Sequence, residues 1–220
     1  MISPEKLDAL QRSWVNLLAP FGVTPAAAYP PFDRLVEAYS EPHRHYHTLE
    51  HVGEVLRVTG RLKGGPAVPL AVWYHDAIYD PKAKDNEAKS AEFAEQELNE
   101  LKLPADVTTR VADLVRSTAH FDTPAFTGHD FDALHDADLA ILGAAEPRYA
   151  RYAADVRKEY AWVSDADYRT GRTKVLEAFL ARERIYRTPL MFAEGEEAAR
   201  RNLRAECDRL ATGRRGEQTS

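Results

Sequence analysis

Residues 70–80 read LAVWYHDAIYD, an apolar run that predicts a short buried helix and carries an adjacent histidine and aspartate, His75 and Asp76. An imidazole and a carboxylate side by side can chelate one divalent cation. Further ligand types lie upstream, at His51 in YHTLEHV, and downstream, at Asp138 in HDADLAILG. Two nitrogens and two carboxylate oxygens suit a divalent metal ion that keeps water in its open positions. The run therefore predicts a metal site as well as a core helix.

The segments on both sides of this run have helical spacing of apolar residues, and strand-like alternation is scarce. We therefore expect an all-α fold. The run itself belongs to a helix over roughly Val68 to Tyr79. The other expected helices are one ending near Phe21-Gly22, one starting at Pro30-Pro31, one from about Tyr46 to Leu62, one capped by Asp85 or Asn86, one between Pro104 and Thr118, one through Leu134 and Asp138 to Gly143, and three over about 149–162, 167–184 and 194–210.

Length and composition narrow the class of protein. The chain has 220 residues, of which 44% are hydrophobic and 29% charged, as in a globular domain. We expect one compact helical domain over 1–212, with the signature core at about 44–143, C-terminal helices over 147–211 and a disordered tail at 213–220. The formal net charge of -6 gives no broad basic surface for a nucleic acid polymer.

The cysteine content and the hydropathy of the sequence argue against a disulfide-bonded, membrane or secreted protein. Cys207 is the only cysteine, so an internal disulfide and a cysteine-based zinc site are excluded. No apolar run approaches the roughly 20 residues that span a bilayer, so no membrane association is expected. The start of the sequence lacks the basic-then-apolar order of a secretion signal. We therefore expect a cytoplasmic protein.

The histidines indicate where the chemistry lies. All eight fall between His43 and His135, and none lies in the last third of the chain. His47 and His51 are four residues apart and would share one face of the predicted helix. His120 ends a predicted helix, before a loop at 120–130, and could contact substrate, bind a second metal or interact with the helix dipole. We expect surface or packing positions for the remaining histidines, His43, His45, His129 and His135.

A cation would also explain the acidic residue Asp138. Apolar residues flank it on its predicted helix, and a buried carboxylate costs several kcal/mol unless a positive charge compensates it. Each of these features has an ordinary explanation, because buried histidine and aspartate side chains often bond to each other. Their occurrence together, in this order and on predicted helices, favours a metal site.

These residues resemble the signature of the HD-domain superfamily of metal-dependent phosphohydrolases, H…HD…D on a helical core. The resemblance implies that His51, His75, Asp76 and Asp138 bind the metal. YHTLEH is similar to the YHNxxH element of cyclic-nucleotide phosphodiesterases, which implies that His51 is the ligand and His47 the proton donor. ADL at 137–139 is similar to the ADRL element of stringent-response hydrolases, which favours Asp138 over Asp136.

A wider resemblance covers nearly the whole chain. RHYHTLEHV, HDAIYDP, DNEAKSA and DADLAILG resemble an uncharacterised bacterial group of predicted HD phosphohydrolases. The sequence departs from related patterns at HDAIYD, which lacks the Gly-Lys of the HDIGK form. The acidic pair that follows HD in some relatives is Tyr79-Asp80 here, so only Asp80 keeps a carboxylate.

The resemblance predicts metal-dependent hydrolysis of a phosphate ester by metal-activated water. The substrate would be a nucleotide or another small phosphomonoester or diester, and the cofactor a divalent ion such as Mn, Co, Ni, Fe or Mg. Asp80 would be the general base and His47 the general acid. The expected contributors to substrate binding are Arg44, as a phosphate contact, together with His120, Lys84 and Arg116. Glu87 would orient a ligand or stabilise a helix start.

Three other functions are compatible with the same residues. The first is a non-catalytic metal- or nucleotide-binding regulatory domain. The second is a di-iron oxygenase on the same fold, which needs more histidine ligands than the one extra that His120 offers. The third is a purely structural helical protein, which would leave the four-residue ligand set unexplained.

Overall fold

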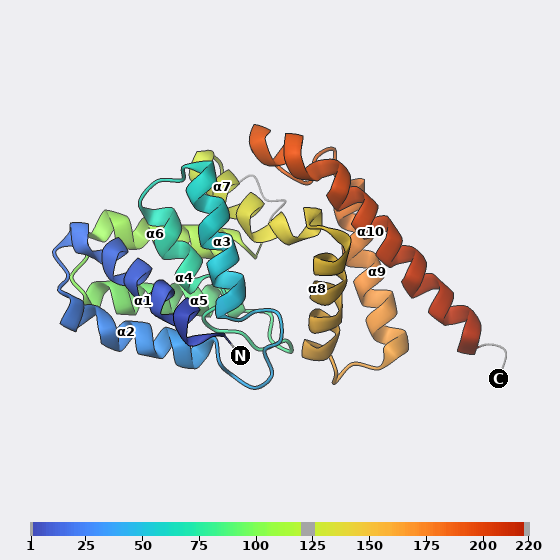
Figure 1. The fold of residues 1–220 in the computed structure, drawn as a ribbon, viewed down its shortest axis with the longest axis horizontal. Coiled ribbons are helices and arrows are strands. Elements are labelled where there is room, and N and C mark those ends of the chain that lie inside the picture. Colours follow the sequence, from blue (N-terminus) through green and yellow to red (C-terminus); the bar gives the residue numbers. More distant parts are fainter. Residues whose placement is uncertain (1, 120–125, 218–220) are drawn as a thin grey trace. The chain divides into compact units, whose positions relative to one another are not determined.

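The computed structural model describes residues 2–119 and 126–217, with side chains through residue 212, and every regular element in these ranges is helical. Ten α-helices and two 3-10 helices follow one another there, which confirms the all-α prediction (Figure 1). The chain divides into two compact units, one ending at Ala137 and one starting at Asp138. The expectation that residues 1–212 form one domain stays a prediction.

The first unit is organised around α4, the helix formed by the apolar run at the centre of the sequence. Its elements are α1 (Pro4–Leu18), η1 (Ala19–Phe21), α2 (Pro25–Ala38), α3 (Leu49–Leu62), α4 (Ala67–Tyr74), α5 (Asn86–Glu100), α6 (Ala105–Ser117) and α7 (His129–Asp138). All but one of the residues of α4 are buried, and the helix contacts α3, α5 and α6 (Figure 1). A helix that is apolar on every side belongs inside a core.

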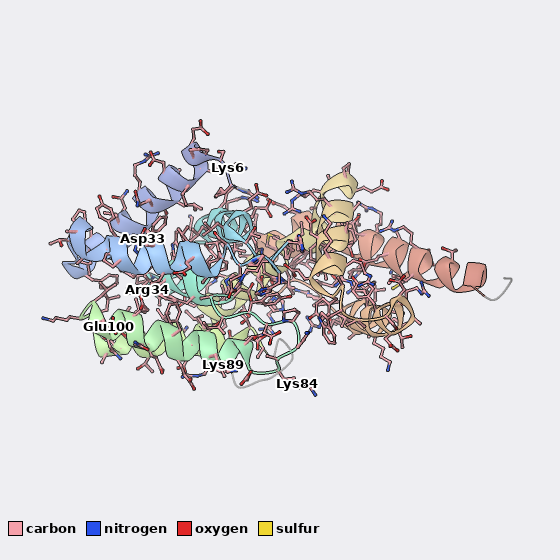
Figure 2. The ribbon with its side chains drawn as sticks, turned by 90° about the horizontal axis from the view of Figure 1, so that it is seen from below. Lys6, Asp33, Arg34, Lys84, Lys89 and Glu100 are labelled. Carbon is pink, nitrogen blue, oxygen red and sulfur yellow. The ribbon has the colours of Figure 1, made fainter. Side chains whose placement is uncertain are left out.

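Aromatic side chains and one ion pair join the outer helices to this core. Trp14 of α1 packs edge-on against Trp73 of α4, with ring centroids 5.4 Å apart. Arg34 of α2 points toward α5 (Figure 2) and donates two hydrogen bonds of 2.8 Å to the buried carboxylate of Glu97. The first unit is therefore held by packing in its centre and by a charge-assisted clamp at its edge.

The N-terminal helices agree with the sequence at one boundary and differ at another. The first helix continues as η1 to Phe21, in agreement with the expected end near Phe21-Gly22, and Gly22 then adopts a positive φ of 79°. The second helix begins at Pro25, not at Pro30-Pro31, so that prediction was wrong. The Thr24 hydroxyl accepts a 3.3 Å hydrogen bond from the Ala27 amide and caps the earlier start.

The helices on either side of the predicted site are shorter than expected. α3 begins at Leu49, so His47 lies in the bend before it. α4 ends at Tyr74, and His75 and Asp76 lie on the turn that follows. Side-chain bonds replace the helical ones there: the Ser90 hydroxyl bonds to both the amide and the carbonyl of Ile78, and Arg44 bonds to the carbonyls of Asp76 and Ala77. Because side chains satisfy the hydrogen bonds of these backbone groups, the helix can end here without leaving them unpaired.

The second unit consists of η2 (Leu139–Gly143), α8 (Glu146–Glu159), α9 (Asp165–Ala181) and α10 (Pro189–Glu217). Asn202 of α10 donates 2.8 Å bonds to the carbonyls of Leu142 and Ala144. Glu206 accepts hydrogen bonds from Arg172 and from the hydroxyl of Tyr149, whose pKa is raised by burial and by that carboxylate. The three long helices begin two to five residues before their predicted starts, and α10 continues past residue 212, where the tail was predicted to begin.

Candidate metal centre

Three of the predicted ligands converge in the structure. The ligand atoms of His51, His75 and Asp138 all lie within 4.8 Å of one another. His51 lies in the first turn of α3, His75 caps the C-terminus of α4, and Asp138 is the last residue of α7, whose preceding residues belong to the first unit. Both histidines are buried and Asp138 is half-buried. Residues far apart in the sequence are thus brought together away from bulk water.

The His75 ring is oriented as a metal ligand would be. Its Nδ1 lies 2.8 Å from the carbonyl oxygen of Val72. Because a carbonyl only accepts, Nδ1 must carry the proton of this hydrogen bond. In the neutral ring the lone pair then belongs to Nε2, which lies 3.1 Å from Nε2 of His51. A backbone carbonyl that fixes the tautomer in this way is the usual partner of a metal-ligating histidine.

Asp76 adds a second carboxylate beside the two imidazoles. Its Oδ2 lies 3.0 Å from Nε2 of His75 and 3.7 Å from Nε2 of His51. Two ring nitrogens and two carboxylates facing one another need a positive charge among them, either protons or a metal ion. The donor set fits a divalent ion such as Mn, Fe, Co, Ni or Zn, which accept imidazole and carboxylate ligands together. A divalent metal could therefore be held by His51, His75 and Asp138, with Asp76 beside them.

His47 lies beside this cluster, but for a different structural reason from the one predicted. Because α3 begins at Leu49, His47 and His51 do not share a helix face, and that expectation was wrong. The bend before α3 nevertheless leaves their ring centroids 5.9 Å apart. The half-buried His47 ring also lies against Tyr79, at a centroid distance of 4.3 Å. The predicted proton donor is therefore next to a candidate ligand.

Arg44 has surroundings that differ from those of a phosphate contact. Its side chain is fully buried. Its guanidinium donates to the backbone carbonyls of His47, Asp76 and Ala77, and its Nε donates to Glu41. Four acceptors leave it little capacity for a substrate. This role could not be predicted from the sequence, because a hydrogen bond to a backbone carbonyl does not depend on the identity of the accepting residue.

The other predicted substrate contacts are exposed or already paired. Lys84 is exposed on the loop before α5 and extends away from the ribbon (Figure 2). Arg116 of α6 lies 3.1 Å from Glu95 of α5 and 3.6 Å from Asp113.

The predicted general base, Asp80, is exposed, and its Oδ1 accepts a 2.9 Å hydrogen bond from the Lys82 amide. Glu87 is in the first turn of α5, as the helix-start interpretation expects.

The remaining histidines mostly bond to the protein itself. His43 lies 2.7 Å from the carbonyl of Tyr79, and His129 lies 2.9 Å from the carbonyl of Leu62. His135 is buried and lies 2.8 Å from the carboxylate of its neighbour Asp136, while His45 is exposed. His120 and most of the predicted loop at 120–130 lie outside the described residues.

Comparisons with known proteins give no relative: no family model, no curated protein and no solved structure matches the chain. Across the part of the chain that the structure describes, no helix is both long enough and apolar enough to cross a membrane. Any function must therefore be argued from the cluster itself.

Proposed function

We propose that the protein is a metal-dependent phosphohydrolase that acts on a small phosphate ester, with its cation held by His51, His75, Asp76 and Asp138. The observation that carries the proposal is the convergence of the ligand atoms of His51, His75 and Asp138, beside which Asp76 lies 3.0 Å from His75. The Val72 carbonyl fixes the His75 ring so that its Nε2 faces His51. The order of the residues, H…HD…D, is the order that the HD-domain resemblance requires. A divalent ion at this place supplies charge neutralisation for a phosphoryl group and activation of a water molecule.

The protein's own residues contribute burial and proton transfer. The buried imidazoles of His51 and His75 exclude bulk water from one side of the reacting groups, which strengthens electrostatic interactions there. His47 is half-buried beside them, and an imidazole in this place can protonate the leaving oxygen of the ester. Tyr79 lies against the His47 ring and restricts its position.

The general base is less well supported than the acid. Asp80 is five residues beyond His75, but its carboxylate is exposed and accepts a bond from the Lys82 amide. We therefore assign the acid to His47 and expect only a small effect from loss of the Asp80 carboxylate.

The proposed substrate class follows from the charge of the chain. The formal net charge of -6 does not favour a nucleic acid polymer. A nucleotide or another small phosphomonoester or diester needs only the cation and a few polar contacts. The proposed substrate is therefore a small molecule.

A panel of phosphate esters tests the proposal. Protein stripped of metal and reloaded with Mn²⁺, Co²⁺, Ni²⁺ or Mg²⁺ is assayed for phosphate or alcohol release, with Asp138→Ala as the control for contaminating hydrolases. We expect turnover of at least one ester class with one of the metals and its loss in the variant. Turnover that persists in Asp138→Ala contradicts the proposal. Metal binding without turnover of any ester contradicts hydrolysis and leaves a metal-binding regulatory domain.

A further inference from the structure

We infer that Arg44 is a positioning residue that fixes the His47 bend to the turn carrying His75 and Asp76. This inference rests on the proposed function for its consequence, but its structural basis lies in hydrogen bonds alone. One guanidinium reaches both segments, which are separated by about 30 residues of sequence. It thereby sets the distance between the proposed proton donor and the proposed ligands.

The first step of the argument is the burial of the cation. The Arg44 side chain is fully buried, whereas Glu41, its carboxylate partner among the described residues, is 44% exposed. A buried guanidinium costs several kcal/mol unless its donors are satisfied. Glu41 accepts from Nε at 2.9 Å, and backbone carbonyls must therefore satisfy most of the remaining N–H groups.

The second step concerns the carbonyls that Arg44 satisfies. α4 ends at Tyr74, so the carbonyls of Asp76 and Ala77 have no following helical turn to bond to. Arg44 donates from Nη1 to the Asp76 carbonyl at 2.6 Å and from Nη2 to the Ala77 carbonyl at 2.9 Å. The conformation of the ligand-bearing turn therefore depends on this side chain.

The third step links the turn to His47. Nη1 of Arg44 also donates to the carbonyl of His47 at 3.2 Å, so the same nitrogen holds both segments. The guanidinium also lies over the ring of Tyr79, which packs against His47. A planar guanidinium, with several N–H donors in fixed directions, can bond to both segments at once, whereas the ammonium group of lysine offers a single nitrogen.

Metal affinity and amide exchange test the inference in Arg44→Gln and Arg44→Lys. The dissociation constant for Co²⁺ is measured by absorption, and hydrogen exchange is followed in the metal-free protein at the amides of Thr48 and Ala77. Both amides make local hydrogen bonds, to Tyr46 at 2.8 Å and to Tyr74 at 3.0 Å. Arg34→Gln is the matched control, because it removes another ion-paired arginine of the first unit, whose hydrogen bonds go to Glu97 of α5.

We expect Arg44→Gln to raise the Co²⁺ dissociation constant by about 10- to 100-fold, as loss of groups that orient metal ligands does. Exchange at Thr48 and Ala77 should accelerate together, and Arg44→Lys should fall between wild type and Arg44→Gln. Arg34→Gln should lower the melting temperature without changing either quantity.

Two results would overturn the inference. One is a folded Arg44→Gln protein, or Arg44→Lys if the first does not fold, with wild-type Co²⁺ affinity and wild-type exchange at both amides. The other is a rise in KM for an ester with metal affinity unchanged, which would make Arg44 a substrate contact. If the wild-type protein binds no metal, the proposed function fails, but the exchange data still decide the positioning role.

Discussion

Metal binding should stabilise the folded protein by an amount that can be calculated. The candidate ligands come from α3, from the C-terminus of α4 and from the end of α7, so the unfolded chain does not keep them together. An ion that binds only the folded state adds RT ln(1 + [M]/Kd) to its stability. At a free metal concentration of 100 times Kd this is about 2.7 kcal/mol.

This free energy corresponds to a measurable change in melting temperature. For chains of 150–250 residues, 1 kcal/mol shifts Tm by about 2–4 °C, so we expect a rise of about 5–11 °C. The assay is thermal unfolding followed by far-ultraviolet circular dichroism, which is sensitive in a helical protein. Chelator-treated protein is compared with the same protein at 100 times the separately measured Kd.

Two histidine variants make the test specific. His75→Ala removes a buried ligand and should abolish the rise in Tm. His129→Ala removes a histidine that bonds to the carbonyl of Leu62 and should lower Tm in both states while keeping the rise. An equal rise in His75→Ala and wild type, or none with any divalent ion, would refute the reasoning.

Three further variants test other parts of the account. His47→Ala should slow hydrolysis of alkyl esters by about 10²- to 10⁴-fold but affect esters with good leaving groups much less, because those need no proton; equal losses in steady-state kinetics would argue against the acid role. Asp80→Asn should change kcat by less than about 10-fold, and a larger loss with metal retained would restore Asp80 as the base. Arg172→Met should cost the second unit about 3–5 kcal/mol in chemical denaturation, because Glu206 stays buried without its cation, while Co²⁺ affinity should stay unchanged. An undiminished stability would show that the ion pair is dispensable.

Much of the fold could be predicted from apolar spacing. Residues 70–74 of the central run are apolar or aromatic, and the structure buries them at the centre of the first unit. Helix starts were less predictable, because caps and prolines compete locally. Pro30 and Pro31 look like a helix start, but Thr24 and Pro25 offer a capped start five residues earlier.

The ligand cluster was predictable in its members and not in its local geometry. His51, His75 and Asp138 were chosen by their order in the sequence, and the structure brings their ligand atoms together. The end of α4 before His75 could not be foreseen, because it depends on hydrogen bonds from Arg44 and Ser90, which lie far away in sequence. Such side-chain-to-backbone bonds are set by tertiary structure and not by periodicity.

The metal content of the purified protein tests the central claim most directly. Elemental analysis after dialysis against a divalent metal should give about one ion per chain for the wild-type protein and for His129→Ala. His75→Ala and Asp138→Ala should each retain almost none. Wild-type stoichiometry in either ligand variant, or no bound ion in the wild-type protein, would contradict the account.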